Sequence, residues 1–327
     1  MWGKKERKLF REIIRSKWFG ILASFVFLLL ILPLFVPRFY TYILALIFVT
    51  SLLAMSLNLV VGHGGLFQFH HGVFYGVAAY TVALMLKKTS LPMWTGFIAG
   101  PIAAAIIGLI IGWLCVRLTR LYFGMLQISL GSLIWVIVFR WYSFTGGDDG
   151  LPGIPMPTIL SPLKNSYYFI LIIFVICLIL MYLILKSPFG NTLQAIRDNP
   201  QRCEAVGINV RRHQLIAIVI ATFFAGVAGV LFVVLERSVF TELLFWVFSL
   251  EIFIMCLLGG WFTFAGPILG AAIMVALRTF VNIFTEYWTL ILGIVLILLI
   301  FFLPEGVMGF FQRFFKPGTK EVAERGK

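Results

Sequence analysis

Charged residues are scarce in this sequence: they make up 12% of its 327 residues, whereas 61% are hydrophobic. Soluble domains average about 25% charged residues. The shortage excludes a soluble domain and predicts an all-α, polytopic membrane protein. The formal net charge is +13, but the basic residues lie outside the apolar runs, where they are typical topology signals. They indicate anionic membrane lipid as an electrostatic partner, and nucleic acid is not expected.

Motifs for several activities are also missing. The sequence has no GxxxxGK[ST] phosphate loop, so the chain is not expected to hydrolyse ATP itself. It has no HExxH pair, no arginine ladder and no run of acidic residues within an apolar span. Its four cysteines, Cys115, Cys177, Cys203 and Cys256, form no CxxC pair and are expected to be buried, small hydrophobic residues. We therefore expect no catalytic residue, metal site or cofactor, and an energy source on another chain.

Apolar runs dominate what is present. A helix needs roughly 20 apolar residues to cross a membrane, and the sequence contains about ten such spans. They fall at 18–36, 39–61, 66–86, 93–116, 121–141, 167–185, 213–235, 244–259, 264–284 and 288–303. The first run has no small-residue cleavage site and is interpreted as an uncleaved span. Small residues at four-residue spacing, as at Gly108 and Gly112, predict close helix packing.

The distribution of basic residues predicts the orientation of these spans. The basic N-terminus, 1–17, is expected in the cytoplasm. Alternate crossings then place the loop 186–212 and the tail 304–327 inside, the loop 143–166 outside, and a transmembrane domain at 18–303. Lys87 and Lys88 fall on the outside and disagree with the rule. Either they snorkel from a short span, or the segment 66–86 does not cross fully.

Two glycine-rich stretches interrupt the apolar pattern. They run from Val61 to Leu86 and from Gly259 to Leu277. With a one-residue gap in the second, Gly64, Gly65, Phe67, Phe69, Gly72 and Gly76 align with Gly259, Gly260, Phe262, Phe264, Gly266 and Gly270. A weak internal repeat with broken helical segments in matching places points to a transport path. The sequence leaves open whether the repeat is parallel or inverted.

The first stretch carries candidate residues for that path. Gly64 and Gly65 predict a broken backbone, and Gln68, His70 and His71 would lie near the break. Neighbouring helical residues diverge by roughly 100°, so the two histidines cannot share a metal. Two interpretations stay open for them: hydrogen bonding to a backbone carbonyl within the packed bundle, or lining the path.

A second group of candidates comes from the later spans. Glu251 lies within an apolar span, where a carboxylate is costly and is by default a functional hypothesis. Arg278 and Arg140 are its candidate partners. Either a structural ion pair or a role in solute passage would explain the acid. Gly259 and Gly260 complete the candidate residues for the path or its gate.

The loop 186–212 contains signals for a short helix. Asn199 can cap it, Pro200 suits its first position and Gly207 suits the residue beyond its end, which together predict a helix at 200–206. The helix is either a rigid connection or a docking element for a cytoplasmic partner. The candidate coupling residues are Pro200, Arg202, Glu204, Ala205 and Gly207.

Four blocks in order resemble the permease subunits of branched-chain amino acid ABC transporters, in particular the M-type subunit. They are SLNLVVGHGGLFQFHHGVFYGVAAY from Ser56, GGDDGLPGIP from Gly146, AIRDNPQRCEAVGINVRRHQL from Ala195 and SLEIFIMCLLGGWFTFAGPILGA from Ser249. In the first block, Asn58, Gly62, Gly65, His71, Phe74, Gly76 and Tyr80 match the family pattern. Gln68 replaces the usual serine, and His70 replaces the usual glycine. In the last block, Phe262 replaces a glycine.

This resemblance implies a non-enzymatic permease subunit of an ATP-driven importer in the bacterial inner membrane. It implies a second homologous permease, two cytoplasmic ATPase subunits and an extracytoplasmic solute-binding protein as partners, with both termini of the chain in the cytoplasm. Branched-chain amino acids are the expected solute. The alternative is a self-sufficient channel or secondary transporter for a small polar solute, such as urea or another amino acid.

Overall fold

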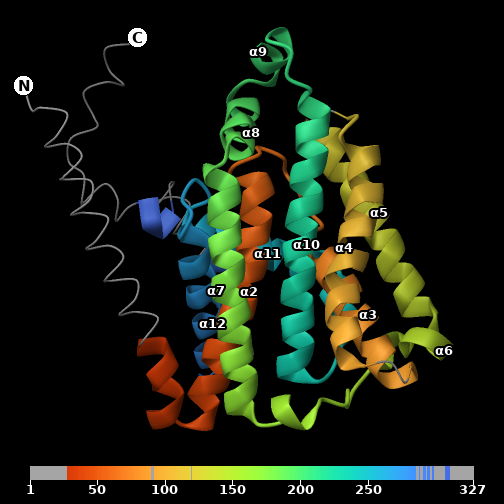
Figure 1. Cartoon of the computed structure of the whole chain (residues 1–327), viewed down its shortest axis with the longest axis vertical. Coiled ribbons are helices and arrows are strands. Elements are labelled where there is room, and N and C mark those ends of the chain that lie inside the picture. The colour runs from red at the N-terminus through yellow and green to blue at the C-terminus, as the bar shows by residue number, and fades with distance from the viewer. Residues whose placement is uncertain are drawn as a thin grey trace, which may run out of the picture.

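The computed structural model describes residues 28–89, 92–118 and 120–284, with further short pieces between 287 and 309. The described part is helical throughout, apart from turns and one isolated β-bridge (Figure 1). The predicted basic terminus 1–17, and most of the span 288–303 and of the tail 304–327, lie outside the described residues. Of the first predicted span, residues 28–35 are described and are helical.

Two long helices form the centre of the bundle. They are α2 (Arg38–Val61) and α10 (Val210–Glu236), and 78% and 72% of their apolar stretches are buried (Figure 1). Small residues allow other helices to pack closely against α10, because a Cβ on Gly229 would lie 2.3 Å from the Tyr75 carbonyl oxygen and one on Gly108 would lie 2.1 Å from the Thr222 hydroxyl oxygen. The prediction of close packing at small residues is therefore confirmed for α10.

Three further long helices surround this centre and expose apolar side chains. They are α4 (Met93–Cys115), α5 (Arg120–Arg140) and α7 (Leu163–Lys186). Only 22% of the apolar stretch of α5 is buried, and 33% of that of α4 and of α7. Such all-round apolar helices suit a lipid environment, where outward-facing leucine and isoleucine carry no penalty.

The remaining apolar helices are shorter and lie beside the two glycine-rich turns. The helix α3 (Gly72–Lys88) has 17 residues, α11 (Trp246–Gly259) has 14, and α12 (Gly266–Phe284) has 19. Six described helices are long and apolar enough to span a membrane, so the predicted count of about ten is not confirmed. The predicted spans 66–86 and 244–259 differ most, because each contains a short helix and 66–86 begins with irregular backbone.

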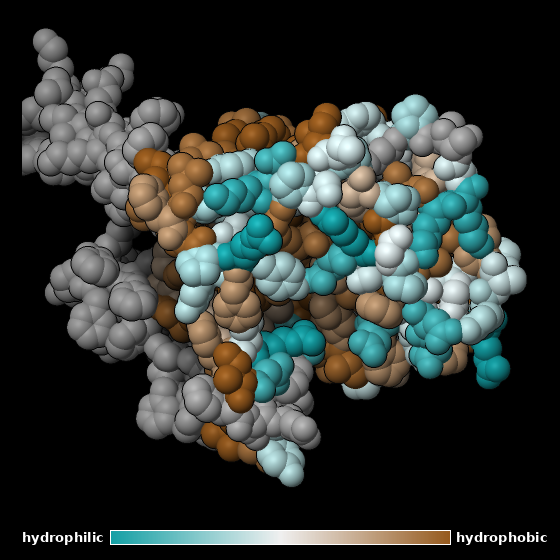
Figure 2. Space-filling model, turned by 90° about the horizontal axis from the view of Figure 1, so that it is seen from below, coloured by the Kyte–Doolittle hydropathy of each residue, from teal (hydrophilic) through white to brown (hydrophobic). Residues whose placement is uncertain are grey.

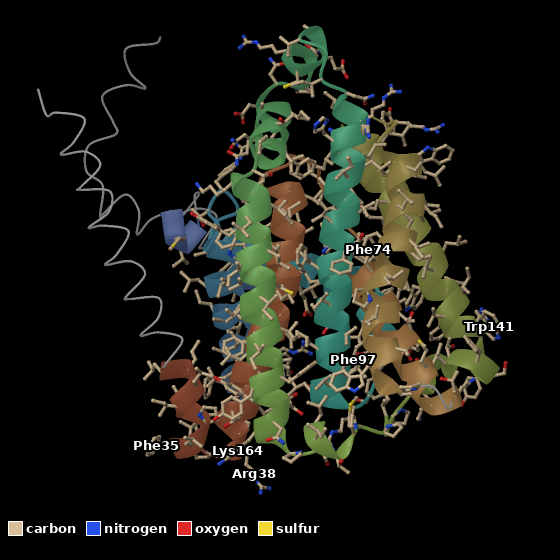
Figure 3. The ribbon with its side chains drawn as sticks, viewed as in Figure 1. Phe35, Arg38, Phe74, Phe97, Trp141 and Lys164 are labelled. Atoms are coloured by element: carbon tan, nitrogen blue, oxygen red, sulfur yellow. The ribbon has the colours of Figure 1, made fainter. Side chains whose placement is uncertain are left out.

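Two polar regions mark opposite ends of the bundle. The helices α8 (Pro188–Asp198) and α9 (Pro200–Ala205) lie at one end, here called the α8–α9 end (Figure 1). The short elements α6 (Tyr142–Thr145), η1 (Gly147–Asp149) and η2 (Thr158–Leu160) lie at the other, the loop end. Figure 3 shows Arg38 and Lys164, near the starts of α2 and α7, at the loop end as well.

The loop end is held by local bonds. Leu151 pairs with Val239, with N–H···O distances of 2.8 and 3.1 Å, which joins the loop to the segment after α10. Asp149 accepts a hydrogen bond from the Tyr142 hydroxyl, and this bond raises the pKa of the phenol. Lys88 Nζ donates to the carbonyl of Phe144 at 2.8 Å. Since α3 reaches this loop, the chain between α2 and α4 extends to the loop end.

The two glycine-rich segments have the same direction. In each case a helix leads to the α8–α9 end, the chain turns there, and a helix leads back: α2 then α3, and α11 then α12 (Figure 1). The short helix follows the turn in the first segment and precedes it in the second. This arrangement is the parallel one of the two that the sequence left open.

Candidate functional site

The two glycine-rich turns touch each other at the α8–α9 end. A Cβ on Gly62 would lie 2.0 Å from the Trp261 carbonyl oxygen, so no side chain fits at that position. The Asn58 amide nitrogen donates to the Thr263 carbonyl oxygen at 3.2 Å. Segments about 200 residues apart in sequence therefore form one junction.

The backbone of both turns is irregular at the predicted positions. Gly65 has φ +67° and Gly260 has φ +104°, conformations that favour glycine. A Cβ on Gly64 would lie 2.6 Å from the Val60 carbonyl oxygen, and one on Gly259 would lie 1.9 Å from that of Gly266. The prediction of broken helices at these glycines is confirmed.

The short helices α3 and α11 meet inside the bundle at their N-termini. The backbone N–H of Gly72, the first residue of α3, donates to the Ser249 hydroxyl on the first turn of α11 at 2.9 Å. Gly72 and Ser249 are both buried. Each helix N-terminus carries a partial positive charge. Two such ends therefore converge within the bundle, a feature of membrane transporters that bind anionic groups.

The two histidines point to different neighbours, as the spacing predicts. His70 Nε2 lies 2.9 Å from the Leu244 carbonyl oxygen, and its Nδ1 lies 3.2 Å from that of Ile128. His71 Nε2 lies 2.8 Å from the Ser56 hydroxyl. Both rings are buried and bind protein groups, which favours the packing interpretation. Among the described residues, no group of three metal-ligating side chains occurs.

Gln68 is different, because it is buried without partners. Neither its amide nitrogen nor its oxygen has a hydrogen-bond partner within the described part of the chain. Leaving a buried polar atom unpaired costs about 1–3 kcal/mol. Gln68 is therefore the candidate residue of the first stretch that packing alone explains least.

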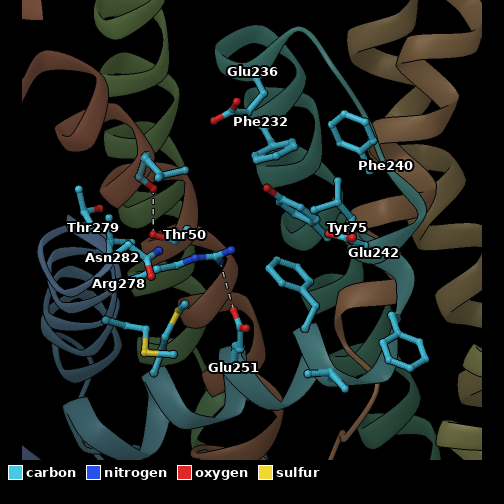
Figure 4. Close-up of a pocket in the computed structure, with 18 of the residues that line it drawn as sticks. Thr50, Tyr75, Phe232, Glu236, Phe240, Glu242, Glu251, Arg278, Thr279 and Asn282 are labelled. Carbon is cyan, nitrogen blue, oxygen red and sulfur yellow. Dashed lines mark hydrogen bonds and ion pairs between the residues drawn. The ribbon is translucent and has the colours of Figure 1, made fainter. Parts of the chain in front are cut away.

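A cleft of about 770 Å³ lies between α2, α3, α10, α11 and α12. Its polar lining includes Tyr42, Thr50, Glu236, Glu242, Glu251 and Arg278, and its apolar lining includes Phe232, Phe248, Met255, Met274 and Val275 (Figure 4). Figure 2 views the molecule from the loop end and shows hydrophilic surface across the middle of that face, bordered by apolar surface. The cleft contains Tyr42 and Glu236, which lie near the loop-end termini of α2 and α10.

Opposite charges face each other in this cleft. Arg278 Nη1 lies 3.6 Å from Glu251 Oε2, so the first of the two candidate partners of Glu251 pairs with it. The Glu251 side chain is 18% exposed, whereas that of Arg278 is 55% exposed. The Tyr42 hydroxyl donates to Glu236. The Glu251–Arg278 pair therefore combines a largely buried acid with an accessible cation.

The predicted docking helix is present at the α8–α9 end. It runs from Pro200 to Ala205, one residue shorter than predicted. The Asn199 side chain accepts a hydrogen bond from the Arg202 backbone N–H at 3.0 Å, and Gly207 beyond the helix has φ +87°. Arg202, Glu204 and Ala205 are exposed, and Pro200 is partly buried. A second cleft, of about 680 Å³, lies between this helix, the α4–α5 connection and the first glycine-rich turn.

Sequence reasoning missed three residues of these regions. Tyr42 and Glu236 lie near span ends, where polar residues are ordinary, and only the fold brings them together. Arg197 is one of several basic residues in the loop 186–212, and the structure places it against Gly62, with its Nη1 2.8 Å from the Gly62 carbonyl oxygen. The helix α8 was also missed, although Ser187 followed by Pro188 is an N-terminal signal.

These features define a multi-pass, α-helical membrane protein with a charged cleft between broken helices. The chain belongs to the family described as "Branched-chain amino acid transport system / permease component", which matches residues 18–300. The predicted family is thus confirmed.

Individual relatives agree with this assignment. The chain is 28% identical to the high-affinity branched-chain amino acid transport system permease protein LivM of Escherichia coli, over 90% of this chain and 75% of that protein. It is 26% identical to the corresponding LivH protein of Salmonella typhimurium, over 79% and 91% of the two chains. It is 23% identical to a probable LivM of Methanocaldococcus jannaschii, over 63% and 66%. No solved structure matches the chain.

Proposed function

We propose that this chain is a transmembrane permease subunit of an ATP-driven importer of branched-chain amino acids, and that the charged cleft is part of its translocation path. The observation that carries the assignment of the path is the Glu251–Arg278 pair in a cleft with apolar walls. Ionisable residues inside a membrane protein mark solute pathways by default.

The chemistry of the cleft suits a zwitterion with an aliphatic side chain. Arg278 can bind a carboxylate, assisted by the N-terminus of α11, whose first-turn residues Val247 and Phe248 line the cleft. The carboxylates of Glu236, Glu242 and Glu251 can bind an ammonium group. The methionines and phenylalanines of the wall offer the apolar surface that a branched side chain needs.

The remaining candidate residues have assigned roles in this proposal. Gly64, Gly65, Gly259 and Gly260 form the junction that opens or closes the path at the α8–α9 end, and Gln68 lies near it. His70 and His71 hold the adjoining elements in place. Pro200, Arg202, Glu204, Ala205 and Gly207 form the element that contacts an ATPase subunit.

The proposal includes an orientation and partners. The α8–α9 end and both termini face the cytoplasm, the loop 143–166 faces outward, and the protein resides in a bacterial inner membrane. A second permease, two ATPase subunits and an extracytoplasmic solute-binding protein complete the transporter, since LivM and LivH relatives are both named as permease proteins of one kind of system. This chain itself is not an enzyme.

Reconstitution in liposomes tests the proposal. With its partner permease, the ATPase subunits and the binding protein, the chain should support ATP-dependent uptake of leucine, isoleucine or valine, and no uptake should occur with a non-hydrolysable ATP analogue. The chain alone should give no flux. Flux of an amino acid or of urea through the chain alone would instead identify a self-sufficient channel or secondary transporter.

A further inference from the structure

We propose that Arg197 is the positioning residue that joins the docking helices to both glycine-rich turns and transmits their movement to the path. The inference rests on the proposed function for its direction, from ATPase to path. The contacts of Arg197 that support it all lie at the α8–α9 end.

The helix α8 lies directly against the first glycine-rich turn. Leu193 and Arg197 are four residues apart and therefore share one face of α8. A Cβ on Gly64 would lie 3.5 Å from Leu193 Cδ1, and a Cβ on Gly65 would lie 2.6 Å from Arg197 Cγ. A Cβ on Gly64 would make only an ordinary contact with Leu193, so the absence of a side chain at Gly65 is what lets α8 approach the turn so closely.

The guanidinium group of Arg197 binds both the first glycine-rich turn and the neighbouring Asp198 of α8. Arg197 Nη1 donates to the Gly62 carbonyl oxygen at 2.8 Å, and its Nε and Nη2 donate to Asp198 Oδ1 at 3.0 and 2.9 Å. Gly62 directly follows α2, where carbonyl groups have no partner within the helix. A cation at a helix C-terminus also interacts favourably with the helix dipole. Arg197 therefore caps the C-terminus of α2 from the last turn of α8.

The same residue reaches the second turn. Its guanidinium lies 5.4 Å from the centre of the Phe262 ring, and the Cα of Gly62 faces the Trp261 carbonyl oxygen. Three residues beyond Arg197, Pro200 begins the exposed helix α9. A displacement of α9 is thus transmitted through Arg197 to the first turn. It also reaches the second turn, because the two turns contact each other at Gly62 and Trp261.

Arginine suits this position better than lysine. Its planar group carries donors in several directions at once, so it can hold Gly62 and Asp198 together. A lysine ammonium on a flexible stem can reach one of them but does not fix their separation. Removing the side chain removes both the hydrogen bond to the Gly62 carbonyl and the close contact of Arg197 Cγ with Gly65.

The test compares Arg197→Ala and Arg197→Lys with Arg212→Ala, a control that removes an exposed cation from the same cytoplasmic region. Hydrogen exchange of the chain in detergent reports on the turn itself, since the amides of Gly65 and Leu66 bond to the carbonyls of Val61 and Val60 at 3.1 Å. Arg197→Ala should speed their exchange about tenfold, as expected from losing a charge-assisted hydrogen bond. Arg212→Ala should leave it unchanged.

The second measurement is the amount of amino acid taken up per ATP hydrolysed by the complete transporter in proteoliposomes. Arg197→Ala should lower this ratio at least fivefold while ATP hydrolysis continues, and Arg197→Lys should give an intermediate ratio. A residue that only supports folding would lower uptake and hydrolysis together and leave the ratio unchanged.

The outcomes separate this inference from the proposed function. A wild-type ratio in Arg197→Ala, or unchanged exchange at Gly65 and Leu66, would overturn the role of Arg197. A wild-type transporter that takes up no amino acid would overturn the proposed function, and hydrogen exchange would still decide whether Arg197 holds the turn.

Discussion

Asn58 and Thr263 lie 205 positions apart in sequence, yet the Asn58 side-chain amide donates a hydrogen bond to the Thr263 backbone carbonyl at 3.2 Å. The bond crosses from the end of α2 to the second glycine-rich turn. Both turns therefore behave as one structural unit at the α8–α9 end. A change in either turn is expected to affect the other.

The first prediction concerns Gly62 at this junction. Gly62→Ala should destabilise the protein by about 2 kcal/mol or more, because the new methyl group would lie 2.0 Å from the Trp261 carbonyl oxygen and 2.2 Å from Asn58 Oδ1. Thermal unfolding in detergent measures the change. Gly96→Ala is the matched control: its methyl group on α4 would have ordinary contacts of 3.7 Å or more with Val82 and Met85 of α3, so it should be neutral or slightly stabilising. Equal stability of the two variants would contradict the close contact.

The second prediction concerns the charged cleft. Glu251→Gln keeps the shape of the side chain but removes the charge that faces Arg278 at 3.6 Å. We expect amino acid uptake by the complete transporter to fall about tenfold or more, which corresponds to the loss of one charge-assisted contact with the solute. Membrane insertion should be unaffected.

Lys164→Gln supplies the control for this prediction, since it also removes one charge but lies on the exposed first turn of α7 at the loop end (Figure 3). It should transport normally. If Glu251→Gln also transports at the wild-type rate, the Glu251–Arg278 pair is structural and the cleft is not the path.

The sequence predicts helix positions well wherever local chemistry decides them. The span predicted at 39–61 is observed at Arg38–Val61, and the helix predicted at 200–206 is observed at Pro200–Ala205. Length and hydropathy determine the first of these helices. The Asn199 cap and the left-handed Gly207 determine the second.

Features that depend on tertiary contact were not predictable in the same way. The segment 66–86 is as apolar as a span, but its helix begins only at Gly72, where the N–H finds Ser249 on a distant helix. The partnership of Glu251 with Arg278 was one of two alternatives until the fold placed α12 beside α11. Nothing in the local pattern distinguishes Arg197 from the other arginines of its loop.

The third prediction concerns the exposed face of α9. Glu204→Lys or Arg202→Glu should uncouple ATP hydrolysis from uptake, because either change reverses a charge on the short helix that we expect to contact the ATPase. Membrane insertion and thermal stability should stay close to wild type, since both side chains are exposed. The ratio of uptake to hydrolysis in proteoliposomes is the measurement, and normal ratios in both variants would exclude this docking role.

The last prediction separates stability from function at Gln68. Its amide is fully buried, and neither polar atom has a partner in the described structure. Replacing a buried, unpaired amide by an apolar group of similar size removes a desolvation cost, so Gln68→Leu should raise thermal stability by about 1 kcal/mol. If the amide contacts the solute in transit, the same variant should lose uptake. His70→Ala should instead lower thermal stability, because it removes contacts at 2.9 and 3.2 Å to the carbonyl groups of Leu244 and Ile128. A Gln68→Leu protein that is both more stable and fully active would assign Gln68 to packing.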